Sequence, residues 1–243
     1  MNVLGVIPAR LGSTRLPRKV LREIGGVPLV AHVYRSARRS PLLADLLVAT
    51  DSDEVGAACR AHGIPWMMTS PDHPCGTDRL WEVSRTRGAD VYVNIQGDEP
   101  FVTPGHVAGL VRPFLEEAAV QVTTLKIRAT PEEAASPNVN KVVTSARGDA
   151  LYFSRNPIPY DRDGRGEVVR WKHVGLYAYR GAVLEAFHAL PPSSLELAEK
   201  LEQLRLLENG IPIRVVETDE RTIGVDTEDD LRVVESLLAA RSA

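Results

Sequence analysis

The first residues that could do chemistry are the basic side chains near the start of the chain. The segment V-I-P-A-R-L-G-S-T-R-L-P-R-K, residues 6–19, carries Arg10, Arg15, Arg18 and Lys19. Small residues between them let backbone N–H groups approach a phosphate, and an arginine can donate two parallel hydrogen bonds to it. The spacing matches neither G-x-x-x-x-G-K-[ST] nor G-x-G-x-x-G. The segment is therefore either a phosphate-binding loop of another kind or a charged turn after a first strand.

Carboxylates occur at two places where a metal ion could bind beside a phosphate. Asp98 lies in N-I-Q-G-D-E-P at the end of an apolar run, and Asp226 lies in G-V-D-T just before the last helical pattern. Mg²⁺ typically takes one or two carboxylates together with phosphate oxygens. The alternatives are an Asp-Glu-Pro turn that caps the next helix, and acidic residues that only stabilise the start of the last helix.

Polar residues in the second half of the chain could hold an acidic substrate. Arg155 and His173 lie near the ends of apolar runs, where the alternatives are surface charge and a structural histidine. Glu202 and Gln203 lie inside one predicted helix, Leu195–Glu208, whose leucines recur at core spacing. That spacing predicts that Glu202 and Gln203 face solvent.

Short apolar runs alternate with helical patterns, which predicts an α/β fold with a mainly parallel central sheet flanked by helices. In such sheets ligands bind beyond the carboxyl ends of the strands, where the loops described above would lie. The predicted strands are Val3–Pro8, Asp45–Thr50, Pro65–Thr69, Asp90–Ile95, Gln121–Ile127, Lys141–Thr144, Leu151–Arg155, Lys172–Tyr179 and Ile213–Glu217. The predicted helices are Val27–Arg39, Asp53–His62, Asp78–Arg87, Gly181–Leu190, Leu195–Glu208 and Thr227–Ala240.

The length and composition indicate one domain over residues 1–243. A chain of 243 residues that is 44 % hydrophobic can bury a large core. The strand and helix alternation changes over residues 130–180, which predicts a smaller sheet lobe laid over the main sheet. No internal repeat or low-complexity linker divides the chain.

Composition also excludes several classes of function. A net charge of -3 gives no general attraction to nucleic acid. No apolar run approaches the roughly 20 residues of a spanning helix, so we expect no membrane insertion. Cys59 and Cys75 form neither a disulfide framework nor a zinc motif, which together with the lack of a secretory leader favours a cytoplasmic protein.

Taken together, these segments resemble the 3-deoxy-manno-octulosonate (Kdo) cytidylyltransferases, the CMP-Kdo synthetases of lipopolysaccharide biosynthesis. The resemblance covers almost the whole chain, although Cys75 stands where the family usually has Ser and Arg18 where Gly is common. It rests on residues 6–19 and on the ordered motifs V-A-T-D, M-T-S-P-D-H-P-C-G-T-D-R, N-I-Q-G-D-E-P, P-N-V-N-K-V-V, A-L-Y-F-S-R-N-P-I-P, K-H-V-G-L-Y-A-Y-R, L-E-L-A-E-K-L-E-Q-L-R and G-V-D-T-E-D-D-L.

The resemblance implies a Rossmann-like nucleotidyltransferase fold, CTP and Kdo as substrates, Mg²⁺ as cofactor and a homodimer. The lobe at 130–180 would then cover the sugar site and contribute to the dimer interface. A cytidylyltransferase for 8-amino-Kdo or a sialic acid remains an alternative, as does a nucleotidyltransferase that makes a UDP- or dTDP-sugar. A catalytically silent nucleotide-binding module would lack metal carboxylates, whereas Asp98 and Asp226 are both present.

The resemblance also assigns roles to individual residues. The catalytic residues would be Lys19, Asp98 and Asp226, with Asp98 and Asp226 as metal ligands. The residues that would bind CTP are Arg10, Ser13, Arg15 and Lys19 at the triphosphate, and Thr69, Ser70, Asp72, Gly76 and Thr77 at the cytosine and ribose. The residues that would bind Kdo are Gln96, Arg155, His173, Tyr177, Glu202 and Gln203.

Overall fold

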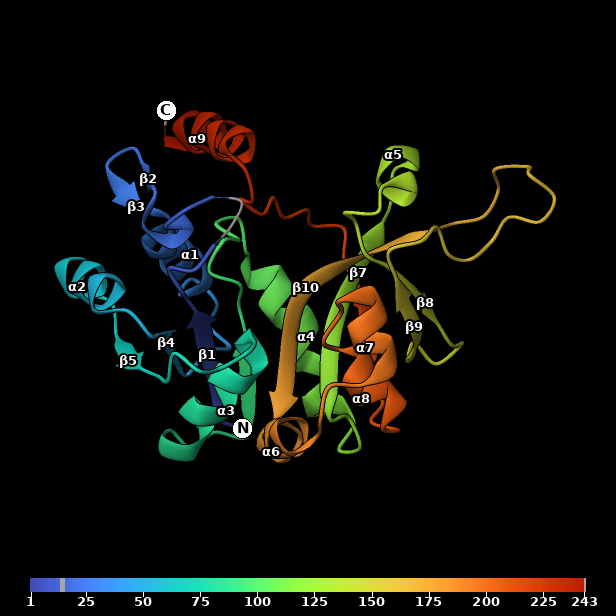
Figure 1. Ribbon diagram of the computed structural model, residues 1–243, viewed down its shortest axis with the longest axis horizontal. Helices are drawn as coiled ribbons and strands as arrows, with labels where there is room; N and C mark the ends of the chain where they lie inside the picture. The colour runs from blue at the N-terminus through green and yellow to red at the C-terminus, as the bar shows by residue number, and fades with distance from the viewer. Residues whose placement is uncertain (14–15, 243) are drawn as a thin grey trace.

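A single large sheet runs through the middle of the protein, with helices on both of its faces (Figure 1). The computed structural model describes residues 1–13 and 16–242. The strands are β1 (Val3–Pro8), β2 (Glu23–Ile24), β3 (Val27–Pro28), β4 (Asp45–Thr50), β5 (Trp66–Met68), β6 (Val91–Asn94), β7 (Val122–Arg128), β8 (Lys141–Thr144), β9 (Ala150–Ser154), β10 (Trp171–Arg180) and β11 (Arg214–Glu217). The α-helices are α1 (Leu29–Ala37), α2 (Asp53–Ala61), α3 (Gly76–Thr86), α4 (Pro104–Glu116), α5 (Pro131–Ala135), α6 (Gly181–Ala189), α7 (Ser194–Glu199), α8 (Leu204–Glu208) and α9 (Glu228–Ser242).

The main path of the sheet is mostly parallel. Its order is β11-β7-β10-β6-β1-β4-β5, and β10 is the strand that runs antiparallel to both of its neighbours on this path. β1 pairs in parallel with β4 and with β6, so the carboxyl ends of these strands meet at one edge. The predicted α/β fold with a mainly parallel sheet is therefore confirmed.

Two apolar cores cover the two faces of the sheet. On one face, residues of α1, α2 and α4 pack against the strands, and on the other face residues of α3, α6 and α8 do so. The α1 helix illustrates the pattern, because its buried side chains recur at helical spacing and include Leu29, Val30 and Val33. A third apolar cluster joins Leu231 and Val234 of α9 to the β2–β3 hairpin.

The segment 130–180 contributes both to the main sheet and to a side extension. β10 pairs with β7 along almost its whole length. On its other edge, its first residues pair with β8 and its last residues pair with β6, and β8 pairs with β9. The connection between β9 and β10 extends away from the rest of the chain (Figure 1). The sheet extension and the main sheet are thus built on one continuous strand.

One predicted helix begins late, and two further helices were missed. The helix predicted at 27–39 begins only at Leu29, because Val27–Pro28 pairs with β2 across Gly25 and Gly26, which have the positive φ angles that a tight hairpin requires. The α4 and α5 helices were not predicted. Both begin with a threonine capping box followed by proline, at Thr103 and Thr130, which is a sequence signal for a helix start.

The single helix predicted at Leu195–Glu208 is wrong. Lys200 adopts a left-handed conformation with φ of 55°, and the chain forms two short helices, α7 and α8, on either side of the turn. The turn changes the direction of the chain, so the apolar spacing of the leucines no longer dictates where residues 202 and 203 point. Gln203 is 4 % exposed instead of facing solvent.

Within the described ranges, no helix combines the length and the apolar character needed to cross a membrane.

Candidate active site

A cleft of about 420 Å³ lies at the carboxyl ends of β1 and β6. It is bordered by the loop after β1, the loop after β6, the start of α3 and the segment before α9. The predicted site residues that line it are Arg10, Ser13, Lys19, Gly76, Gln96, Asp98, Glu202 and Asp226. The cleft therefore brings together residues from the two ends of the chain and from its middle, as expected for a parallel sheet.

At one end of the cleft, Lys19 bridges the two predicted metal ligands. Its Nζ atom lies 2.5 Å from Asp98 Oδ2 and 2.9 Å from Asp226 Oδ1. Lys19 begins a short 3₁₀ turn directly after Arg18, whose φ of 57° turns the chain. The two acidic loops are tied together by their backbones, because Val225 N–H donates to Asp98 O at 2.9 Å.

The electrostatics of this triad suit a bound cation. Burial opposes the charge on Lys19, but the attraction of Asp98 and Asp226 outweighs burial and raises the Lys19 pKa above its ordinary value. The ammonium group thus takes the position between two carboxylates that a metal ion would also favour. The described part of the chain contains no cluster of three or more His, Cys, Asp or Glu side chains able to hold a metal. Two carboxylates completed by phosphate oxygens are a donor set typical of Mg²⁺.

Glu99, the residue after Asp98, lies beside the triad. Burial raises its pKa to about 7, with a further contribution from Asp98. One of its carboxyl oxygens is buried without a hydrogen-bond partner among residues 1–13 and 16–242. The neighbouring Gly97 is required for a different reason, since a Cβ atom there would lie 2.8 Å from Pro8 O. The Q-G-D-E turn therefore packs directly on the end of β1.

The basic loop contributes only some of its charges to the cleft. Arg10 and Ser13 line it, as predicted. Arg15 lies outside the described residues. Arg18, to which the sequence gave no role, forms an ion pair with Glu54 of α2. This pairing explains why an arginine is compatible with the position even though it does not line the cleft.

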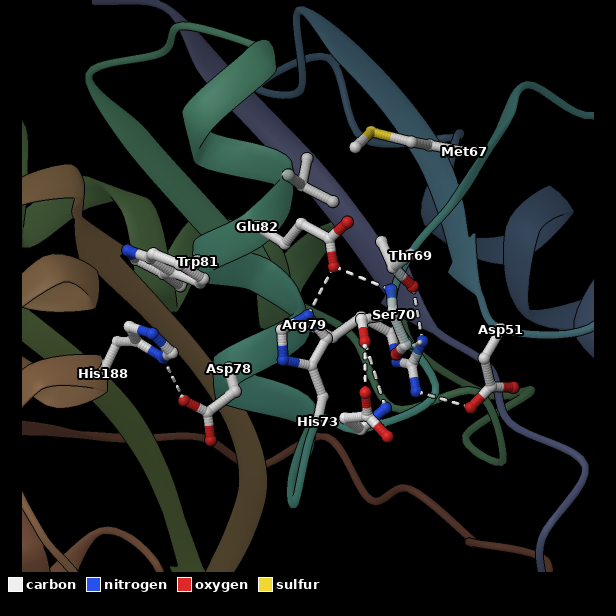
Figure 2. A network of polar contacts seen from close by, with 12 residues as sticks. Asp51, Met67, Thr69, Ser70, His73, Asp78, Arg79, Trp81, Glu82 and His188 are labelled. Carbon is white, nitrogen blue, oxygen red and sulfur yellow. Dashed lines mark hydrogen bonds and ion pairs between the residues drawn. The ribbon is translucent and has the colours of Figure 1, made fainter.

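The segment predicted to hold cytosine and ribose lies along the other side of the cleft, and Figure 2 shows its polar contacts. Gly76, at the start of α3, lines the cleft. The other residues predicted for cytosine and ribose do not line the cleft; they are Thr69, Ser70, Asp72 and Thr77. The Ser70 hydroxyl accepts a hydrogen bond from Asp72 N–H at 3.1 Å, which closes a local turn in this loop.

Three residues of this segment line the cleft although the sequence assigned them no role in the site. Arg79 and His73 line the cleft although neither was predicted to act, and Cys75 lies there with its thiol 3.0 Å from Asp78 Oδ2. Burial raises the Cys75 pKa far above its ordinary value, so the thiol is uncharged. The three residues belong to the quoted motif M-T-S-P-D-H-P-C-G-T-D-R, which was the available signal.

Two of the predicted sugar contacts lie on the cleft. Gln96 Nε2 donates to Gly175 O at 3.2 Å, so the side chain is fixed toward β10. Glu202 accepts a hydrogen bond from Thr77 Oγ1 at 2.8 Å. Burial raises the pKa of Glu202, although the hydrogen bonds from Cys75 and Thr77 partly offset that effect.

His173, Tyr177 and Gln203 are buried and do not line the cleft. His173 Nε2 lies 2.9 Å from Thr124 Oγ1, and burial lowers the His173 pKa to about 3, so its imidazole is neutral. Within the part of the chain that the structure covers, the Tyr177 hydroxyl and the Gln203 Nε2 make no hydrogen bond. These groups are polar, desolvated and available to a new partner.

The Arg155 side chain forms hydrogen bonds at the C-terminal end of α7. Its guanidinium donates to Glu199 O at 2.7 Å through Nε, and its backbone N–H donates to the Glu199 carboxylate at 2.9 Å. Weaker contacts reach the carbonyl groups of Pro137 and Lys200. The side chain therefore stabilises the carbonyl end of α7, and its predicted role at the sugar carboxylate stays a prediction.

The cleft thus lies beyond parallel strands and combines a basic first loop with a lysine held between two carboxylates. The sequence profile of the family described as Cytidylyltransferase matches residues 4–219. A 3-deoxy-manno-octulosonate cytidylyltransferase from Acidobacterium capsulatum is 59 % identical over 99 % of this chain and 98 % of that protein. One from Koribacter versatilis is 52 % identical over 100 % of this chain and 92 % of that protein.

The comparison with solved structures agrees. A CMP:2-keto-3-deoxy-manno-octonic acid synthetase complexed with CTP superposes with a TM-score of 0.95 at 46 % identity, over 99 % of this chain and 100 % of that one. A cytidylyltransferase from Leptospira borgpetersenii shares the fold, with a TM-score of 0.68 at 16 % identity over 99 % of this chain and 87 % of that one. The chain belongs to the cytidylyltransferase family, among the 3-deoxy-manno-octulosonate cytidylyltransferases.

Proposed function

We propose that this enzyme transfers CMP from CTP to the anomeric hydroxyl of Kdo, which gives CMP-Kdo and pyrophosphate for lipopolysaccharide biosynthesis. The observation that carries the proposal is the convergence of Lys19, Asp98 and Asp226 in one cleft of a chain whose full-length relatives are named Kdo cytidylyltransferases. The CTP-bound neighbour supports CTP as the nucleotide substrate.

The proposed reaction is an in-line substitution at the α-phosphorus of CTP. The anomeric oxygen of the sugar forms the new bond to phosphorus and gives up its proton, while the bond to the β-phosphate oxygen breaks and pyrophosphate leaves. Negative charge grows on the phosphate oxygens during this step, so preorganised cations stabilise the transition state. Arg10 and Lys19 supply such cations from the cleft wall, and Ser13 offers a hydroxyl donor.

Mg²⁺ is the proposed cofactor, with Asp98 and Asp226 as its protein ligands. When bound, it would neutralise charge on the phosphates and acidify the attacking hydroxyl. Lys19, which bridges these carboxylates in the structure, would then be released to contact phosphate oxygens.

The sugar acid is proposed to bind beside Gln96 and Glu202, which line the cleft, with His173, Tyr177 and Gln203 behind them. Their amide, hydroxyl, carboxyl and neutral imidazole groups suit a polyol. Contact with Arg155 would require its guanidinium to exchange the α7 carbonyl groups for the sugar carboxylate. We also propose a homodimer in the cytoplasm, with segment 130–180 at the sugar site and the subunit interface.

The direct test is formation of CMP-sugar from CTP and Kdo in the presence of Mg²⁺, with EDTA as the negative control. The same assay run with 8-amino-Kdo and a sialic acid separates the related acid sugars, and UTP or dTTP in place of CTP tests the base. Binding of CTP without turnover of any acid sugar would leave only a silent nucleotide-binding protein and overturn the proposal.

A further inference from the structure

Arg79 of α3 is a buried arginine that joins three separate segments beside the cleft. Its NH2 atom donates to Asp51 Oδ2 at 2.8 Å, just after β4. Its NH1 atom donates to Thr69 Oγ1 and, at 3.4 Å, to Ser70 O, just after β5. Figure 2 shows the guanidinium between these groups. Arg79 is 3 % exposed, yet it forms part of the cleft wall.

The loop after β5 is held through both the N–H and the carbonyl group of Ser70. Ser70 O accepts from Arg79, while Ser70 N–H donates to Glu82 Oε2 at 2.8 Å. Glu82 also accepts from His73 Nε2 at 2.5 Å. Arg79 and Glu82 are three residues apart and therefore lie on the same face of α3. One helix face thus fixes the orientation of the Ser70 peptide units.

The chemistry of arginine explains why this residue type is suited to the position. A buried guanidinium must be paired to avoid a large desolvation cost, and Asp51 supplies the charge. Its planar fork places donors on two separate nitrogens, so NH2 reaches Asp51 while NH1 reaches Thr69 and Ser70. The three N–H donors of a lysine radiate from one atom, so a lysine could keep the ion pair with Asp51 but would not reach both sides with the same geometry.

We infer that Arg79 is a positioning residue for the nucleotide base, acting by fixing the Thr69–Ser70 loop against α3. This inference rests on the proposed function and on the resemblance, which assigns Thr69, Ser70, Gly76 and Thr77 to the cytosine and ribose. Gly76 and Arg79 line the cleft, so a shift of the Thr69–Ser70 loop against α3 would displace the wall that the base meets and change both CTP affinity and the preference for cytosine over uracil.

The test compares Arg79→Met and Arg79→Lys with a matched control. Arg205→Met removes another buried arginine, which pairs with Glu196 at 2.6 Å and contacts the carbonyls of Phe187 and Leu190 away from the nucleotide loop. Calorimetry gives Kd for CTP and UTP without sugar, steady-state assays give KM for each substrate, and thermal unfolding gives Tm.

We expect Arg79→Met to raise the Kd and KM for CTP about tenfold or more, with KM for Kdo within twofold and the preference for CTP over UTP reduced. Arg79→Lys should recover Tm but not CTP affinity, since the charge is restored without the fork. Arg205→Met should lower Tm and leave both nucleotide Kd values unchanged. An Arg79→Met protein with wild-type CTP affinity and base preference would overturn the inference.

If Arg79→Met does not fold, Asp51→Asn keeps the inference testable. That variant removes the charge that anchors the guanidinium, and we expect a severalfold weaker CTP Kd; an unchanged Kd would overturn the inference. Because the calorimetry needs no sugar, the two proposals fail separately. A wild-type enzyme that binds CTP but transfers nothing to Kdo refutes the proposed function, whereas the Arg79 variants still decide the role of that residue.

Discussion

The two halves of the proposed active site, the nucleotide half and the sugar half, are built in different ways. In the nucleotide half, Lys19 already has charged partners in Asp98 and Asp226. In the sugar half, the Tyr177 hydroxyl and the Gln203 amide nitrogen are buried and lack hydrogen-bond partners in the ranges 1–13 and 16–242. These two side chains are almost fully enclosed.

This difference separates two ways of preparing a site. In the nucleotide half, the Lys19 ion pairs hold the two carboxylates together without a ligand. Unpaired buried polar groups destabilise the empty protein and gain their hydrogen bonds when a ligand arrives. On the proposed assignment, the sugar half needs a local opening before it can accept a polyol, and the turn at Lys200, next to Glu202 and Gln203, is where the chain changes direction.

The largest expected effect comes from breaking the nucleotide half at Asp98. Asp98→Asn should lower kcat roughly a thousandfold, because a carboxylate that organises charge at the transferring phosphate is lost. Steady-state CMP-Kdo formation measures this, and Tm should be unchanged. Asp229→Asn is the matched control, since that carboxylate is exposed and pairs with Arg232. Near-normal turnover of Asp98→Asn would remove it from the catalytic residues.

A smaller and more selective effect is expected in the sugar half at Gln203. Gln203→Ala should raise KM for Kdo about tenfold and leave KM for CTP within twofold, because a buried amide partner of the polyol is removed. Asn209→Ala controls for a nearby amide that only caps α8 through Arg205 O. A parallel rise in both KM values would show that the two halves are not independent.

The pH dependence of stability should reveal the buried imidazole of His173. Its pKa is about 3 in the folded protein, because burial disfavours the charged form, against about 6.5 in an unfolded chain. The unfolded state therefore binds more protons below pH 6.5, so the contribution is complete above that pH and is lost as the pH falls toward 3.

At pH 5 this loss amounts to roughly 2 kcal/mol. Denaturant unfolding of the wild type and His173→Gln at pH 7.5 and pH 5 measures it. The variant should lose less stability between the two pH values than the wild type does. Equal losses would mean that the imidazole is not buried as described.

The smallest expected effect is a gain in stability at Asn94 on β6. Both side-chain polar atoms of Asn94 are buried, and neither is paired within the described structure. Asn94→Leu keeps the number and branching of the side-chain heavy atoms and removes the desolvated amide, so it should stabilise the protein by about 1 kcal/mol, or 2–4 °C in Tm. Thr123→Val is the control, since that buried hydroxyl donates to Leu110 O and its loss should not stabilise. A lower Tm for Asn94→Leu would contradict the prediction.

Local sequence patterns predicted the elements that run through the core. β1, β4 and β8 have the predicted bounds, because continuous apolar runs between polar residues leave few alternatives. The helix at Pro104–Glu116 escaped prediction, since Gly105, Gly109 and Pro113 weaken its helical pattern. Its threonine cap was the signal that would have found it.

The topology made the loops that follow β1 and β6 the easiest part of the site to predict. Lys19 and Asp98 lie in loops after β1 and β6, and the topology alone brings such loops together. Arg79 could not be found in this way, because an arginine on a helix normally indicates a solvated surface, and its partner Asp51 is 28 residues away. The turn at Lys200 could not be predicted either, because the helical spacing of the leucines continues on both sides of it.

The contact between Lys19 and Asp226 spans 207 residues of the chain. Asp226 is held in place by the backbone contact to the Asp98 loop and by the start of α9, where Asp230 accepts from Asp226 N–H. During synthesis on the ribosome, the basic loop and Asp98 emerge long before the carboxylate that completes the triad. A chain cut before Asp226 therefore lacks one carboxylate of the triad, and on the proposed mechanism it would not support CMP transfer.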